Sequence, residues 1–229
     1  DESWNEVGVL THIIAVTNQK GGVGKTTTAI SLSACLADCG KRTLLVDLDP
    51  QGNATSGLGI DKTSLTKNLY DCLIEHISMT EVVQNTMIKK LAVIPATMDL
   101  AGAAVELVTV PQREYVLKNV LNEYLQSLKK PYDYVIMDCP PSLGLLTVNA
   151  LAAADSVLIP VQCEFYALEG LAQLMQTVEM VRSSLNDKLH LLGLLMTMYD
   201  GRTNLSIQVT EEVKKYFSGQ VFKTIIPRN

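Results

Sequence analysis

The chain has 229 residues, with 24 acidic and 19 basic side chains and a formal net charge of -5. This length suits one α/β domain with a full core. The negative balance excludes a bulk attraction to nucleic acid or to an anionic membrane, so any such binding needs a local patch. Five cysteines without a paired framework, and no secretory signal in the first ten residues, are typical of a protein from the reducing cytoplasm.

Short Val- and Ile-rich runs alternate with segments of helical periodicity, which is the pattern of βα repeats. The runs predict strands at 13–17, 43–47, 91–94, 134–138, 156–160, 191–197 and 221–226. The periodic segments predict helices at 26–39, 66–75, 111–128, 145–153, 168–185 and 205–217. Gly40 is expected to cap the first helix and Pro111 to lie in the first turn of the third. The fold class expected is α/β, doubly wound, with about seven mostly parallel strands and helices on both faces.

We expect residues 1–229 to form a single domain, because no linker, repeat or low-complexity segment divides them. Residues 52–64 are the most loop-like internal stretch, and residues 1–10 are expected to be a flexible extension. The chain begins with Asp rather than Met and stops soon after a strand-like segment, so a longer parent protein is expected. No apolar run reaches the length of a membrane span, and no membrane attachment is expected.

The segment NQKGGVGKTT, residues 18–27, lies between the first predicted strand and the first predicted helix. The common phosphate loop G-x-x-x-x-G-K-[ST] fails here by one residue, because Gln19 stands at the first glycine. The predicted phosphate-binding residues are Lys20, Gly21, Gly22, Val23, Gly24, Lys25, Thr26 and Thr27. Glycines let backbone N–H groups converge on a phosphate, and the following helix adds the positive end of its dipole. Lys25 would reach the β- and γ-phosphates, and the Thr26 hydroxyl would ligate Mg²⁺.

Three carboxylates stand at or just after the ends of predicted strands. Asp47 and Asp49 lie two residues apart, so both would face the same side of an extended chain. Either could hold a Mg²⁺-bound water or orient the attacking water, whereas the alternative is an Asx-type turn before Pro50. Asp138 closes the apolar run YDYVIMD, which has the form of a Walker B strand whose carboxylate supports the metal.

Five blocks occur in order: KGGVGKTT from residue 20, DLDPQGNATSGLG from 47, DCPPS from 138, VQCEFYALEGL from 161 and MYDGRT from 198. Together they resemble the ParA-type, Soj-like partition ATPases of the deviant Walker A class, which also contains MinD. The resemblance covers residues 12–229. The family continues past the IPRN segment into C-terminal helices that are missing here, and residues 1–10 are no part of the shared pattern.

The resemblance implies an ATPase that uses ATP and Mg²⁺ and forms a face-to-face homodimer when ATP binds. Such a dimer coats double-stranded DNA without sequence preference and is stimulated by a ParB-type centromere-binding protein. The location implied is cytoplasmic and nucleoid-associated. Matching positions make Lys20 the signature lysine, Lys25 the Walker lysine and Asp49 the residue that positions the attacking water. Thr26 and Asp138 correspond to the metal-site residues, with Asp47 near the metal.

Lys20 raises a separate question, because Lys25 and the loop amides already suffice for the phosphates of their own subunit. In a face-to-face dimer, Lys20 could extend to the phosphates of the other subunit and act in trans, as an arginine finger does. The alternatives are a solvated loop lysine and one that supplies charge only to its own site.

Positive charge gathers near the end of the chain, at Arg202, Lys214, Lys215, Lys223 and Arg228. Lys and Arg contacts to phosphates are what non-specific DNA binding requires. The alternative is a solvated helix face, because the two neighbouring lysines follow Glu211 and Glu212 at helical spacing. Arg202 and Arg228 lie outside that cluster and are the predicted DNA-binding residues.

Two other ATPase functions are alternatives to DNA partition. A MinD-like membrane-associated ATPase would attach through a C-terminal amphipathic helix, but PQGNATSGLG after Asp49 looks like partition ATPases. An iron–sulfur ATPase related to nitrogenase reductase would need cysteine ligands, and neither Cys139 nor Cys163 stands in such a context. Cys35 and Cys39 are expected to be buried small hydrophobes rather than metal ligands.

Overall fold

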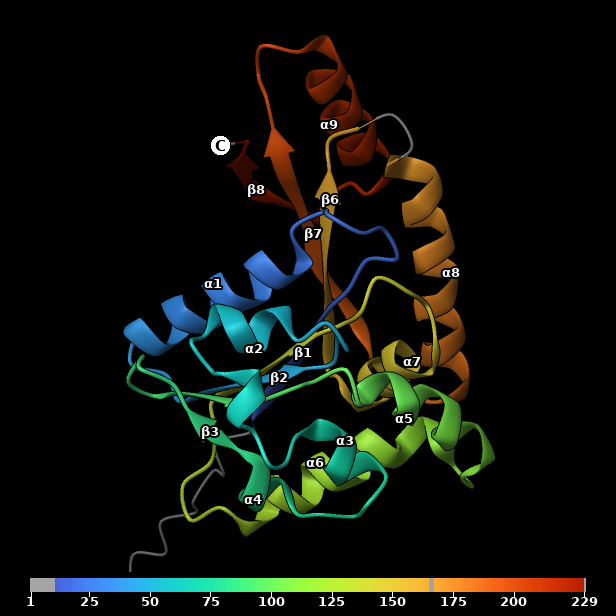
Figure 1. Ribbon diagram of the computed structural model, residues 1–229. Coiled ribbons are helices and arrows are strands. Elements are labelled where there is room, and N and C mark those ends of the chain that lie inside the picture. Colours follow the sequence, from blue (N-terminus) through green and yellow to red (C-terminus); the bar gives the residue numbers. More distant parts are fainter. Residues whose placement is uncertain (1–10, 165–166, 229) are drawn as a thin grey trace, which may run out of the picture.

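The structure is a computed structural model that describes residues 11–164 and 167–228 (Figure 1). One eight-stranded sheet has the order β3-β4-β2-β5-β1-β6-β7-β8. Its strands are β1 His12–Val16, β2 Thr43–Asp47, β3 Gln84–Asn85, β4 Leu91–Ile94, β5 Tyr134–Asp138, β6 Ser156–Gln162, β7 His190–Tyr199 and β8 Val221–Pro227. The β3–β4 pair is antiparallel and the other pairs are parallel. The seven predicted strands are confirmed; β3 was missed because two residues carry no periodicity.

The helices are α1 Lys25–Asp38, α2 Asn53–Gly57, α3 Leu69–Leu73, α4 Met79–Val82, α5 Leu100–Glu106, α6 Val116–Ser127, α7 Leu145–Ala153, α8 Ala167–Ser184 and α9 Asn204–Tyr216, with 3-10 turns at η1 Lys62–Ser64, η2 Leu107–Thr109 and η3 Arg113–Tyr115. The prediction for residues 66–75 was too long, because Asn68 and Asp71 form a capping box that starts α3 at Leu69. The predicted loop at residues 52–64 contains α2 and η1.

Pro111 does not lie in the first turn of a helix, so that prediction was wrong. Gln112 has φ 53°, outside the helical region, and separates Pro111 from η3 and α6. The prediction for Gly40 is confirmed. This glycine has φ 87°, and the N–H of Lys41 donates to Leu36 O at 3.0 Å, which is the bond that closes a Schellman motif.

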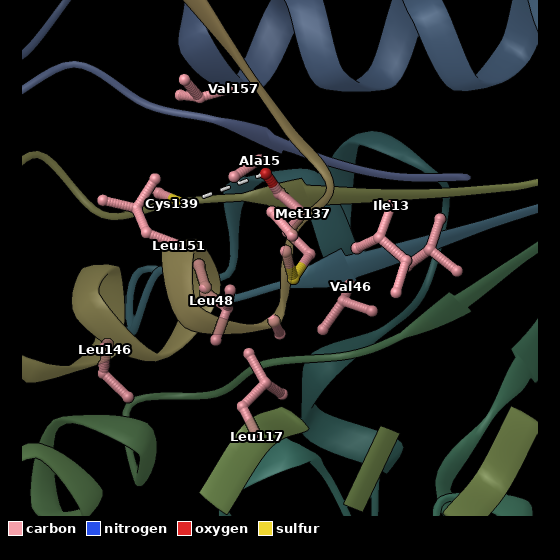
Figure 2. Packing of buried hydrophobic residues seen from close by; sticks show 14 of the residues in the cluster. Ile13, Ala15, Val46, Leu48, Leu117, Met137, Cys139, Leu146, Leu151 and Val157 are labelled. Carbon is pink, nitrogen blue, oxygen red and sulfur yellow. Dashed lines mark hydrogen bonds between the residues drawn. The ribbon is translucent and has the colours of Figure 1, made fainter. Parts of the chain in front are cut away.

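Strands β1, β2, β4, β5 and β6 are buried on both faces, whereas β8 at the edge of the sheet is largely exposed. Helices α1 and α2 cover one face, and the helices from α3 to α7 lie on the other (Figure 1). Ile13 and Ala15 belong to the core on the second face, whereas Ile14 and Val16 belong to the core under α1. Figure 2 shows the larger core. Fully burying one such leucine or valine contributes about 1.5–3 kcal/mol, so a doubly covered sheet is a rigid base for residues at its edge.

Cys35 and Cys39 are exposed on α1, so the prediction that they are buried was wrong. They lie on the outer side of a helix whose buried positions include Ala29, Ser33 and Ala37. None of the helices in the described ranges has both the length and the apolarity needed to cross a membrane.

Candidate nucleotide site

The predicted phosphate loop follows the carboxyl end of β1 and leads directly into α1. Gly22 has φ 74° and Gly24 has φ 88°, a region that residues with a Cβ rarely adopt, so these two positions require glycine. Gly24 is the N-cap of α1 and has no side chain to offer the helix. The unpaired N–H groups of the first turn therefore remain available to an anion. The loop is also fixed from outside, because Thr197 Oγ1, in β7, donates to Val23 O at 2.8 Å.

Lys25 points back into the loop. Its side chain is buried, and its Nζ donates a hydrogen bond to Lys20 O at 2.7 Å. Burial lowers the pKa of this ammonium, while the negative charges of Asp138 and Asp49 act in the opposite direction. Lys25 thus sits between the loop and the carboxylates, with a neutral carbonyl as its hydrogen-bond acceptor.

Lys20 is exposed, and its ammonium pairs with Glu164 of the same chain. The segment before it is anchored at two points. The N–H of Lys20 donates to Asn18 Oδ1 at 3.0 Å, and Gln19 Nε2 donates to Gln173 Oε1, in α8, at 2.9 Å. Gln19, which replaces the usual glycine, therefore ties the loop to a neighbouring helix. Sequence reasoning missed this role and that of Glu164.

Asp47 and Asp138 end adjacent strands, and their Cα atoms are register partners. Both carboxylates are fully buried, but their surroundings differ. Asp47 Oδ2 accepts from Thr55 N at 2.8 Å and from Thr55 Oγ1 at 2.7 Å, and Asp47 Oδ1 accepts from Asp49 N at 3.1 Å. Neither oxygen of Asp138 has a hydrogen-bond partner with good geometry among the described residues. Asp47 therefore holds its own loop, whereas Asp138 has two oxygens available for a ligand.

The pKa values follow from this burial. Burial, followed by the charge of Asp47, raises the pKa of Asp138 to about 7, and the nearby Thr26 side chain limits the rise. Burial also raises the pKa of Asp47 to about 6, against its hydrogen bonds from Thr55. Two buried carboxylates at this short spacing create a negative site that a cation would stabilise.

Asp49 forms the Asx-type turn that was one of the two interpretations of its position. It is 8% exposed, and its Oδ1 accepts from Gln51 N at 3.0 Å, which is an Asx-type turn. Its charge also acts on Lys25 and on Asp138, so the carboxylate faces the same site as they do. The turn fixes the backbone and leaves the carboxylate beside the phosphate loop.

Arg202 and Arg228 lie together beside the carboxyl end of β7, which is at Tyr199. The Arg202 side chain is 90% exposed, and its Nε and Nη2 donate to the Asp200 carboxylate at 2.9 and 2.8 Å. Arg228 donates its backbone N–H to Tyr199 O at 2.9 Å. The hydrogen bonds from Arg202, and the charge of Arg228, lower the pKa of Asp200 to about 2. The structure therefore brings the two predicted DNA-binding residues to one place.

No group of three or more His, Cys, Asp or Glu side chains suited to a metal ion occurs within residues 11–164 and 167–228. Magnesium does not need such a group, because it usually takes one or two protein oxygens besides phosphate and water oxygens. The unpartnered oxygens of Asp138 and the nearby Thr26 hydroxyl fit that demand. Cys139 fits no redox or nucleophilic role, because it lies in the core of Figure 2, where burial raises the pKa of its thiol far above the usual range.

Replacing Asp138 with asparagine is expected to stabilise the nucleotide-free protein. The folded-state pKa of about 7 exceeds the ordinary value of 3.8, so ionisation of this carboxyl opposes folding. The penalty is fully present above pH 7 and disappears as the pH falls towards 4. Asp138→Asn should thus raise the free energy of unfolding by roughly 2 kcal/mol or more at pH 8, and by less at pH 5.

Thermal and urea unfolding in EDTA at pH 8 and pH 5 would measure this gain. Glu123→Gln, at an exposed position on α6, is the matched control and should leave stability unchanged at both pH values. A variant Asp138→Asn that is no more stable than the parent at pH 8 would contradict the assignment of an unpaired, buried carboxylate.

Comparison with known proteins identifies the family. The model described as "AAA domain" matches residues 11–191. The chain is 60% identical over 217 residues to the sporulation initiation inhibitor protein Soj of Bacillus subtilis, covering 95% of this chain and 84% of that protein. It is 55% identical over 229 residues to the chromosome partitioning protein ParA of Myxococcus xanthus, covering 100% of this chain and 78% of that protein.

Among solved structures, one described as cobyrinic acid a,c-diamide synthase from Mycobacterium smegmatis, with bound ADP and magnesium, superposes with a TM-score of 0.89 and 42% identity, covering 96% of this chain and 88% of that one. The fold, the loop and the identities agree with the resemblance seen in the five sequence blocks. The chain therefore belongs to the Soj/ParA family of chromosome-partitioning ATPases.

Proposed function

We propose that the protein binds ATP and Mg²⁺ at residues 20–27, hydrolyses ATP as a face-to-face homodimer, and holds double-stranded DNA without sequence preference in that state. A ParB-type centromere-binding protein stimulates the hydrolysis, and the protein works in the cytoplasm on the nucleoid. The observation that carries the proposal is the juxtaposition of Lys25, the glycine loop and the unpartnered carboxylate of Asp138 at one edge of the sheet.

The protein's own groups account for phosphate binding. The N–H groups of the loop and of the first turn of α1 donate hydrogen bonds to the phosphate oxygens, because Gly22 and Gly24 leave the backbone accessible. The Lys25 ammonium moves from the neutral carbonyl of Lys20 to a charged phosphate oxygen, which forms the stronger hydrogen bond. Lys25 is already buried beside the loop, so it gives up little hydration in the exchange.

Thr26 and Asp138 are the residues that would hold Mg²⁺, which when bound neutralises charge on the β- and γ-phosphates. Asp47 contributes less directly to metal binding than the sequence predicts, because both of its oxygens accept hydrogen bonds from Thr55 and Asp49. Through these bonds Asp47 fixes the backbone of Asp49. The Asp49 carboxylate then orients the attacking water, and Lys20 of the other subunit stabilises the charge that develops.

For DNA binding, Arg202 and Arg228 form an exposed cationic pair around Asp200. A dimer doubles this surface, which explains how an acidic protein can hold a polyanion. At about 150 mM salt, we expect duplex DNA to be retained with ATP and not with ADP or without nucleotide. Arg202→Ala should weaken this retention equally for different sequences and reduce the slope of log K against log salt by about 1.

Fluorescence anisotropy with two unrelated duplexes, at several salt concentrations, measures both quantities. Arg182→Ala is the control, because Arg182 on α8 is exposed and pairs with Glu179 rather than with groups near β7. Sequence-selective binding by the parent, or an unchanged salt slope for Arg202→Ala, would refute this part of the proposal.

A further inference from the structure

The amino ends of β2, β4 and β5 carry a cluster of cations that the nucleotide site does not use. These three strands are neighbours in the sheet, so the loops that precede them meet at one edge. We call this cluster the amino-edge patch; it consists of Lys41, Arg42, Lys89, Lys90, Lys129 and Lys130. Six of the 19 basic residues of an acidic chain thus gather on three short loops.

Direct contacts hold the three loops together. Thr43 N donates to Lys90 O at 2.9 Å, and Lys90 Nζ donates to Gly40 O at 2.7 Å. The Arg42 guanidinium donates to the carbonyls of Lys130 and Pro131, the latter at 3.0 Å. Arg42 also lies 4.9 Å from the centre of the Tyr132 ring. The acceptors are neutral, so these contacts fix the positions of the two cations without cancelling their charge.

The other four lysines of the patch are exposed, and their ammonium groups make no hydrogen bond or ion pair with any described residue. Two carboxylates stand close in sequence to these loops. Asp38 ends α1, and Asp133 accepts the backbone N–H of Arg42 at 2.6 Å. A hollow of about 330 Å³ between the loops is lined by Arg42, Lys89 and Lys90. The patch is therefore a positive surface on a protein whose net charge is -5.

We infer that the amino-edge patch is a second contact for the phosphate backbone of nucleic acid, independent of bound nucleotide. The cations are spread over three loops rather than converging on one point, which suits a chain of phosphates better than one small anion. The patch lies at the amino ends of the strands and the phosphate loop at the carboxyl ends. Strands of five residues, which span about 16 Å, separate the two.

The position of the patch in the assembly rests on the proposed face-to-face dimer. If the subunits meet through their nucleotide faces, the two patches lie at the outer ends and stay exposed with or without ATP. A weak, salt-sensitive affinity for DNA should therefore persist in the nucleotide-free protein. It would keep the protein near DNA between cycles, while the surface at Arg202 supplies the ATP-dependent binding.

The test is duplex binding without nucleotide at about 50 mM salt, measured by anisotropy and repeated up to 200 mM. We expect the parent to bind weakly and Lys89→Gln/Lys130→Gln to bind about tenfold more weakly or worse, with the salt slope reduced by about 1.8 for two lost phosphate contacts. Lys67→Gln/Arg182→Gln removes the same charge from cations already paired with Glu81 and Glu179, and should bind like the parent. Lys89→Arg/Lys130→Arg should also bind like the parent, because it keeps both charges.

The outcomes separate this inference from the proposed function. Arg202→Ala should weaken ATP-dependent retention and keep the weak nucleotide-free binding, whereas Lys89→Gln/Lys130→Gln should keep ATP-dependent retention and lose the weak binding. The inference is overturned if the nucleotide-free parent shows no DNA binding at 50 mM salt, or if the two double glutamine variants weaken it equally. It is also overturned if the patch binds vesicles containing phosphatidylglycerol at that salt and does not bind DNA.

Discussion

Lys20→Ala should bind ATP with nearly the parent affinity and yet hydrolyse it about 10²- to 10³-fold more slowly, because a cation that stabilises developing charge acts in the transition state. In the structure Lys20 pairs with Glu164 of its own chain, at an exposed site. Exposed pairs contribute about 0–1 kcal/mol, so a partner's phosphates can compete for this lysine. Fluorescent-nucleotide titration and light scattering with ATP measure binding and dimerisation separately.

Lys25→Ala is the matched comparison, because it removes the other lysine of the same loop. In the proposed site Lys25 would contact the phosphates of its own subunit, so its loss should raise the Kd for ATP by about 10- to 100-fold. If Lys20→Ala instead dimerises and hydrolyses ATP like the parent, Lys20 is only a solvated loop lysine. If Lys20→Ala loses nucleotide affinity as Lys25→Ala does, then Lys20 serves its own site.

Asp49→Ala should retain ATP and Mg²⁺ binding and lose hydrolysis by about 10²-fold, because orienting the attacking water is needed only in the transition state. The Asp49 carboxylate also fixes a turn through Gln51 N, so the variant must be shown to fold by circular dichroism. Asp61→Ala is the control: Asp61 also makes an Asx-type turn, at the exposed start of η1, and should leave turnover unchanged. Parent-like turnover in Asp49→Ala would mean that Asp49 is only a turn residue.

Mixing Lys20→Ala with Asp49→Ala joins the two predictions. A mixed dimer contains one site with its own Asp49 intact and an intact Lys20 from the other subunit. Activity gained on mixing therefore supports action in trans, because neither variant alone can assemble such a site. No gain, in samples that light scattering shows to be dimeric, would contradict it.

The place of the glycine loop between a strand and a helix, and of Asp138 at the end of a strand, could be predicted from sequence because both signals are local. Gly22, Gly24 and Lys25 stand within four residues, and Asp138 ends a short Val- and Ile-containing run that is typical of a buried strand. The partner of Asp47 could not be predicted in this way. Thr55 reaches that carboxylate because α2 turns the chain back, in a stretch whose composition indicates a loop. Turn-rich composition does not distinguish a loop from a single helical turn.

The amino-edge patch escaped sequence analysis for a different reason. Its cations occur as three adjacent pairs, separated along the chain by 46 and 38 residues. Each pair alone looks like an ordinary solvated loop. Only the strand order, which places β2 between β4 and β5, brings the pairs together. Charge that is dispersed in sequence can therefore be concentrated in space, and net charge does not report it.

The hydrogen bond from Thr197 to Val23 joins the phosphate loop to a strand that ends at Tyr199, three residues before Arg202. Strand β7 therefore connects the phosphate loop at Val23 with the turn that carries Arg202. Thr197 and the turn that carries Arg202 thus belong to one continuous stretch of chain, which joins the proposed nucleotide site to the proposed DNA surface without a relay through the core.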